Sequence, residues 1–157
     1  MIKSDIRNYR FTDNYQAEWY TYDDGSGELK LRVSLTMTNL DYSSWTSTDG
    51  SFGHWVAIGF GTTSMPGADI IMCLFRYRGV TSDDCFVCFD RFANQRSMPI
   101  DDEISSVVDV DTKKTYYQAA KRVTLTAVFD RPLKGDGGTA QQDFEMTNGA
   151  TFNAIWA

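Results

Sequence analysis

Apolar and polar residues alternate along several stretches of the chain, which is the pattern of strands that bury one face. One face of residues 29–37 carries Leu29, Leu31, Val33, Leu35 and Met37. The same period of two recurs in residues 123–129 and at Phe152, Ala154 and Trp156. Residues 56–60 and 70–77 are almost continuously apolar, as in central strands covered on both faces. The pattern therefore predicts antiparallel strands.

Glycine and aspartate, rather than proline, mark the turns between these segments. Residues 23–27 predict a hairpin turn, and residues 78–79 predict a second one. Residues 41–53 and 135–138 are predicted loops, and residues 112–120 are a candidate short helix. Many short strands with regular turn signals predict an all-β sandwich.

The length and charge of the chain limit what it can be. Its 157 residues fit one domain over residues 1–157, and 42% of them are hydrophobic, which is ordinary for a globular protein. The net charge of −6 argues against a nucleic-acid partner, which needs clustered lysine and arginine. The chain has no apolar stretch long enough to span a membrane, and residues 1–20 are too polar for a signal peptide.

Three cysteines, Cys73, Cys85 and Cys88, raise the question of redox or metal chemistry. Three cysteines and one distant histidine do not predict a structural zinc site. The C-x-x-C spacing lies in a predicted strand and not at a helix start, which argues against a thiol redox motif. A hairpin centred near Gly79 places Cys73 opposite Cys85 or Phe86, so a Cys73–Cys85 disulfide in an oxidising compartment is one prediction. Three buried free thiols are the alternative.

Four motifs in a fixed order carry a resemblance to a known family. They are Trp55-Val-Ala-Ile-Gly-Phe-Gly61, Met65-Pro-Gly-Ala-Asp-Ile-Ile71, Phe129-Asp-Arg-Pro-Leu133 and Ala154-Ile-Trp-Ala157. Together they resemble the DOMON family, a β-sandwich module found beside copper monooxygenases and in b-type cytochrome domains. The resemblance implies an antiparallel immunoglobulin-like β-sandwich of about 9–11 strands, within a larger protein or complex.

The family resemblance also implies a candidate cofactor, haem b. In its haem-binding members, a methionine after the glycine-rich strand is one axial ligand and a histidine near the domain end is the other; Met65 matches the methionine. The single histidine, His54, precedes the 56–60 strand, whereas Met65 follows it. Six residues of strand separate the two by about 20 Å, so we do not expect both on one iron. In the cytochrome members the histidine follows the Ala154–Ala157 motif by a short stretch.

A second set of candidates consists of aromatic residues in or beside the 41–53 loop: Tyr42, Trp45, Phe52 and Trp55. Exposed aromatic rings stack on sugar faces, and long loops on rigid sandwiches often carry binding sites. Trp and Phe also serve as core residues of a β-sandwich, which is the alternative interpretation of this set.

No catalytic motif is present in the sequence. It has no G-x-S-x-G elbow, P-loop or EF-hand pattern, and no histidine is placed to serve a hydrolytic triad. We therefore predict a non-catalytic extracellular or lumenal module that binds a sugar or a protein partner. The alternatives are a b-type cytochrome domain for electron transfer, with Met65 as axial ligand, and a structural subunit without a ligand.

Overall fold

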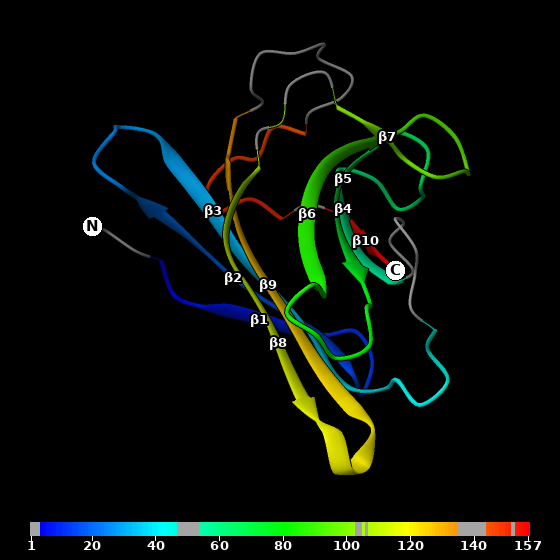
Figure 1. Ribbon diagram of the computed structural model, residues 1–157. Coiled ribbons are helices and arrows are strands. Elements are labelled where there is room, and N and C mark those ends of the chain that lie inside the picture. Colours follow the sequence, from blue (N-terminus) through cyan, green and yellow to red (C-terminus); the bar gives the residue numbers. More distant parts are fainter. Residues whose placement is uncertain (1–3, 47–53, 103–104, 106, 135–143, 152) are drawn as a thin grey trace.

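The computed structural model describes residues 4–46, 54–102, 105, 107–134, 144–151 and 153–157. Within these residues the chain forms ten strands and one 3-10 turn, and the strands build two antiparallel sheets of five strands each. Figure 1 shows the two sheets packed face to face. The predicted all-β sandwich of about 9–11 strands is confirmed.

The first sheet has the order β1-β2-β3-β9-β8. Its strands are β1 (Arg7–Arg10), β2 (Tyr15–Asp23), β3 (Leu29–Asp41), β9 (Arg122–Pro132) and β8 (Val108–Tyr117). The second sheet has the order β10-β4-β5-β6-β7. Its strands are β10 (Ala154–Trp156), β4 (His54–Phe60), β5 (Ala68–Arg76), β6 (Cys85–Ala93) and β7 (Ile100–Asp101).

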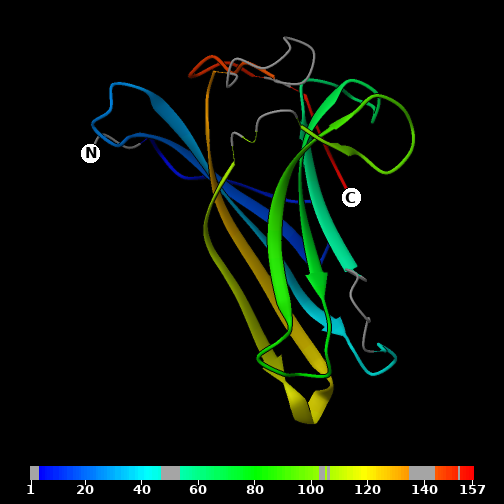
Figure 2. The same cartoon turned by 45° about the horizontal axis from the view of Figure 1, so that its top comes forward.

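The core lies between the sheets, where the alternating positions of the sequence predicted it. Leu31, Val33 and Leu35 of β3 and Val123, Leu125, Ala127 and Phe129 of β9 face Val56, Ile58, Ile71 and Phe75 of the second sheet in one buried cluster. Figure 2 shows these two layers from a second direction, with β6 and β5 crossing in front of β3 and β9. The continuously apolar β5 is buried on its other face as well, where Ala57, Ala68, Ile70, Met72 and Ala93 form a second, smaller cluster.

Local turn chemistry accounts for the first hairpin. Gly25, with φ 95°, occupies the turn between β2 and β3, a conformation that glycine adopts without steric cost. The Asp23 carboxylate accepts a hydrogen bond from the Gly25 N–H at 2.7 Å, and Asp24 accepts one from Ser26 at 3.0 Å. The predicted 23–27 hairpin is confirmed, and this acidic pair serves the turn.

Two of the sequence predictions are wrong at the level of secondary structure. Residues 112–117 belong to strand β8, and only Gln118–Ala120 form a 3-10 turn, so the helix predicted over 112–120 is absent. In β10, Ala154 and Trp156 are exposed and Ile155 is half-buried, which reverses the predicted buried face. Ile155 packs against the smaller cluster, so the more buried position of β10 belongs to the outer face of the sheet. Phe152 lies outside the described residues.

The disulfide joins Cys73 of β5 to Cys88 of β6, and Cys85 is the free cysteine. The predicted Cys73–Cys85 pair is therefore wrong. The prediction placed the hairpin centre near Gly79, but β5 pairs with β6 in a register that sets Cys73 opposite Cys88. The connection between the strands runs from Tyr77 to Asp84, and its length moves the register by three residues. Cys85 instead lies opposite Arg76 at the end of the ladder.

Candidate ligand pocket on the outer face of the second sheet

A pocket of about 560 Å³ lies on the face of the second sheet that points away from the core. Trp55, Ala57 and Gly59 of β4 and Ile70 and Met72 of β5 form its floor. These residues alternate with core residues along their strands, because successive side chains of a strand point to opposite faces. The volume lies within the range typical of small-molecule sites, and the floor is apolar.

Gly59 shapes the floor of this pocket by its lack of a side chain. A Cβ atom at Gly59 would lie 2.8 Å from Ile155 Cγ1 and 3.1 Å from Ile70 Cγ1, which is closer than van der Waals contact. β10 pairs directly with β4, with Ile155 opposite Gly59. The glycine therefore allows two isoleucine side chains to meet over the strand and close the floor.

Met65 reaches the pocket from the β4–β5 connection, whose conformation follows from its sequence. The Ala68 N–H donates to the Met65 carbonyl at 3.1 Å, and Gly67 has φ 83°. Proline at the second position and a positive-φ glycine at the third are the signature of a type II turn, as in Met65-Pro66-Gly67-Ala68. The Met65 side chain lines the pocket and packs against the smaller cluster.

The 94–99 connection after β6 supplies the facing rim. Arg96, Met98 and Pro99 line the pocket, and the Met98 side chain is 61% exposed. The Gly67 N–H donates to the Ala93 carbonyl at 2.6 Å, so this connection and the Met65 turn are joined at their bases. The pocket thus combines the thioethers of Met65, Met72 and Met98 with an apolar floor and the Arg96 guanidinium at the rim.

His54 lies on the opposite face of the sheet from Met65. It shares the inner face of β4 with Val56 and Ile58, and its ring stacks on Trp45 with centroids 3.8 Å apart. Burial lowers the pKa of His54. The second sheet lies between the two side chains, so His54 and Met65 cannot ligate one metal atom, as their spacing in the sequence predicted.

Among the described residues proposed for sugar stacking, Trp45 and Trp55 line one small hollow, whereas the Tyr42 ring is not exposed. Tyr42 is buried and Trp45 is half-buried, and both belong to the main core. Trp55 is 44% exposed and also lines the larger outer-face pocket. Phe52 lies outside the described residues. Burial of Tyr42 therefore leaves Trp55 as the exposed ring among the described members of this set.

A buried ion pair lies directly behind the Met65 turn, between the two sheets. Arg131 of β9 donates to the Asp69 carboxylate at 2.6 Å, and both side chains are almost fully buried. The same carboxylate accepts the Phe144 N–H at 2.9 Å, and Arg131 donates to the Phe144 carbonyl at 3.0 Å. Desolvation by burial raises the pKa of Asp69, against the attraction of Arg131.

Sequence reasoning missed Arg131, Arg96 and Met98 as members of this region. Arg131 continues the inward positions Val123, Leu125, Ala127 and Phe129 of β9, and a charged residue at a core position is the signal that predicts a buried partner. Arg96 and Met98 lie on an irregular connection, where no periodicity indicates which way a side chain points.

The fold is a β-sandwich with an apolar pocket on one outer sheet face, and the comparison with known families assigns its class. The DOMON domain family profile matches residues 12–157, and the chain belongs to this family. Among solved structures, the chain is similar to the cytochrome domain of Myriococcum thermophilum cellobiose dehydrogenase. The two share 14% identity, the similarity covers 81% of this chain and 54% of that chain, and the TM-score is 0.48. No curated protein matches the chain.

The chain therefore spans about half the length of that cytochrome domain chain. Within the described residues, no helix is long and apolar enough to cross a membrane. The Cys73–Cys88 disulfide is compatible with the extracellular setting in which DOMON domains occur.

Proposed function

We propose that this DOMON domain is a binding module whose site is the outer-face pocket, and that its ligand is a flat, largely apolar group, with b-type haem as the first candidate. The observation that carries the proposal is the position of Met65. Its side chain lies over an apolar floor in a pocket of about 560 Å³, where a planar ring could pack on Ile70 and Ile155.

The donor set of the pocket fits haem in part. A thioether is a good axial ligand for a low-spin electron-transfer haem, and the apolar floor excludes water from a macrocycle. Arg96 at the rim supplies a cation for the carboxylates of such a ligand. His54 is not available as the second ligand from inside this chain, since it faces the core. Haem would add one-electron redox chemistry, while the residues named here bind and orient it.

A sugar ligand is less well supported by the geometry. Sugars need several hydrogen-bonding groups around a stacking ring, and the pocket is lined mainly by apolar side chains.

A protein partner is supported by a different feature, the apolar rim of the pocket. Met98, Trp55 and Trp156 line the pocket and are exposed. Such a partner would bind over the exposed rim of the pocket. The Cys73–Cys88 disulfide supports an extracellular or lumenal location.

Titration of the purified protein with hemin, followed by oxidised and dithionite-reduced absorption spectra, tests the proposal. We expect saturable binding, a sharp Soret band and resolved α and β bands on reduction. Met65→Leu removes the thioether with little change of volume, and it should abolish the low-spin spectrum. Met146→Leu is the matched control, because Met146 is buried in the main core. A titration without a saturable spectral change would exclude haem, and unchanged spectra in Met65→Leu would exclude Met65 as ligand.

A further inference from the structure

The turn that carries Met65 is held at both of its ends by one group of three residues on the core side of the second sheet. We define this group, Asp69, Arg131 and Phe144, as the anchor cluster. Asp69 is the second residue of β5, the strand that follows the turn; Arg131 comes from the opposite sheet, and Phe144 comes from the segment before β10. The cluster is joined by the Arg131–Asp69 ion pair and by hydrogen bonds from and to the Phe144 backbone.

The C-terminal end of the turn is held through Asp69. Its carboxylate points to the inner face of the second sheet, where Asp69 lies opposite Phe60, while the neighbours Ala68 and Ile70 belong to the smaller cluster on the outer face. The carboxylate accepts two hydrogen bonds in a nearly dry environment, at 2.6 Å from Arg131 and 2.9 Å from Phe144. Charge-assisted bonds of this kind are directional and strong, so the start of β5 has little freedom to shift.

The N-terminal end of the turn is held through Phe60 and Gly61. The Arg131 guanidinium lies 5.2 Å from the centroid of the Phe60 ring. The Phe144 ring covers Gly61 so closely that a Cβ atom there would lie 2.5 Å from Phe144 Cδ2. Arg131 and Phe144 therefore contact both ends of the β4–β5 connection that carries Met65.

We propose that Asp69, Arg131 and Phe144 are positioning residues that fix the Met65 thioether in the pocket before a ligand binds. Each end of the seven-residue connection between Phe60 and Ala68 is held by contacts on the core side of the sheet, and the Gly67–Ala93 hydrogen bond joins it to the connection after β6. A ligand that coordinates Met65 then meets a side chain that is already held in place, which lowers the entropic cost of binding. The role of Met65 as a ligand rests on the proposed function above, but the positioning itself does not.

The rate at which hydrogen peroxide oxidises Met65 to the sulfoxide, measured by peptide mass spectrometry on the ligand-free protein, tests the positioning. Met98 on the neighbouring connection is the internal reference. We expect Asp69→Asn and Phe144→Ala to raise the Met65 rate several-fold and to leave the Met98 rate unchanged. Phe144→Ala keeps the buried ion pair, so it remains informative if Asp69→Asn does not fold. Arg131→Lys, which keeps the charge but loses the forked geometry, should give an intermediate rate.

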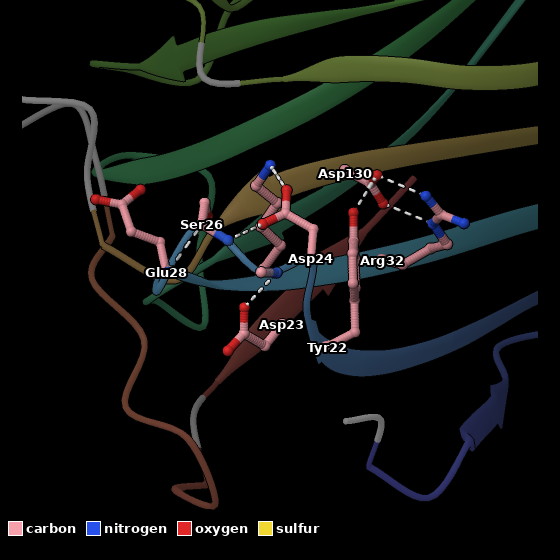
Figure 3. Close-up of polar contacts among 9 residues, drawn as sticks. Tyr22, Asp23, Asp24, Ser26, Glu28, Arg32 and Asp130 are labelled. Carbon is pink, nitrogen blue, oxygen red and sulfur yellow. Dashed lines mark hydrogen bonds and ion pairs between the residues drawn. The ribbon is translucent and has the colours of Figure 1, made fainter. Parts of the chain in front are cut away.

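A matched control uses another Asp–Arg pair to which β9 contributes a residue, Asp130–Arg32. Asp130 binds Arg32 through two contacts of 2.7 Å and accepts the Tyr22 hydroxyl at 2.6 Å, on the face of the first sheet that points away from the core (Figure 3). Asp130→Asn should leave the Met65 rate at the wild-type value. Equal rises in Asp130→Asn and Asp69→Asn would overturn the inference, and so would unchanged Met65 rates in folded Asp69→Asn and Phe144→Ala.

A second measurement uses hemin as the probe and separates this inference from the proposed function. In the haem-loaded protein, we expect Asp69→Asn and Phe144→Ala to weaken the sulfur-to-iron(III) charge-transfer band and to lower hemin affinity several-fold, relative to Asp130→Asn. If the wild-type protein does not bind hemin, the haem proposal fails, while the peroxide rates still decide the positioning. If hemin binds and the variants keep the wild-type band and affinity, the positioning inference fails alone.

Discussion

The His54 imidazole and the Met65 thioether lie on opposite faces of the second sheet. His54 stacks on Trp45 in the interior, and Met65 lines the outer pocket. A strand separates its side chains onto two faces, so no rotamer change can bring the two together. The second sheet therefore has an inner face, where the histidine packs, and an outer face, where the methionine lines the candidate pocket.

We expect His54→Gln to leave the hemin-loaded absorption spectra unchanged, because the histidine does not face the pocket. Oxidised and reduced spectra of His54→Gln and wild-type protein, recorded at equal hemin occupancy, measure this directly. Loss of the low-spin bands in His54→Gln alone would show that the side chain reaches the ligand and would contradict the placement of His54 in the interior.

The partly buried His54 should also make stability depend on pH. Its pKa is lowered from the ordinary value of 6.5 by burial, so the unfolded chain takes up a proton at a higher pH than the folded protein does. The contribution of neutral His54 is therefore present above pH 6.5 and is lost as the pH falls below it. Urea denaturation at about pH 7.5 and about pH 5 should show a larger loss for wild type than for His54→Gln. Equal losses would contradict this assignment.

Removal of the Cys73–Cys88 disulfide should lower the free energy of unfolding by about 3 kcal/mol, the value expected for a loop of this length. The two cysteines are 15 residues apart in sequence, and reduction frees that loop in the unfolded chain. Chemical denaturation of the Cys73→Ala/Cys88→Ala double variant gives the value. Cys85→Ser is the control and should change stability little. A larger effect from Cys85→Ser than from the double variant would favour the pairing with Cys85.

Gly61→Ala should destabilise the protein more than Gly25→Ala does. Both glycines have positive φ, 87° and 95°, so both alanines carry a similar backbone penalty of about 1–2 kcal/mol. A Cβ atom at Gly61 would also meet Phe144 at 2.5 Å, whereas nothing lies within 4 Å at Gly25. The difference between their free energies of unfolding isolates the contact with Phe144. Equal values would show that the Phe144 ring moves away without cost.

Arg131→Met should cost about 3–5 kcal/mol of stability, because it leaves the Asp69 carboxylate buried without its cation. Arg32→Met removes the same residue type from the partly exposed Asp130 pair, and there the loss should be at most about 1 kcal/mol because solvent screens the charge. Thermal or urea denaturation of both variants checks the ranking. A loss in Arg32→Met as large as that in Arg131→Met would show that burial does not set the cost.

Several features of the fold could be predicted from local sequence alone. The alternation in residues 29–37 and 123–129 located the two central strands of the first sheet, since a period of two reports which side chains meet the core. The Asp-Gly hairpin at residues 23–27 was predicted from turn chemistry. The helix expected in residues 112–120 was not found, because pairing of β8 with β9 outweighs weak local preference.

The sequence by itself determined the strands, the turns and the ordered motifs that indicated the family, because each of these depends on residues a few positions apart. Only the tertiary structure decided that Cys73 meets Cys88, that Arg131 meets Asp69, and that Met65 and Ile155 share a pocket. These contacts depend on the register between strands and on which sheet faces pack, and one longer connection can shift a register by several residues.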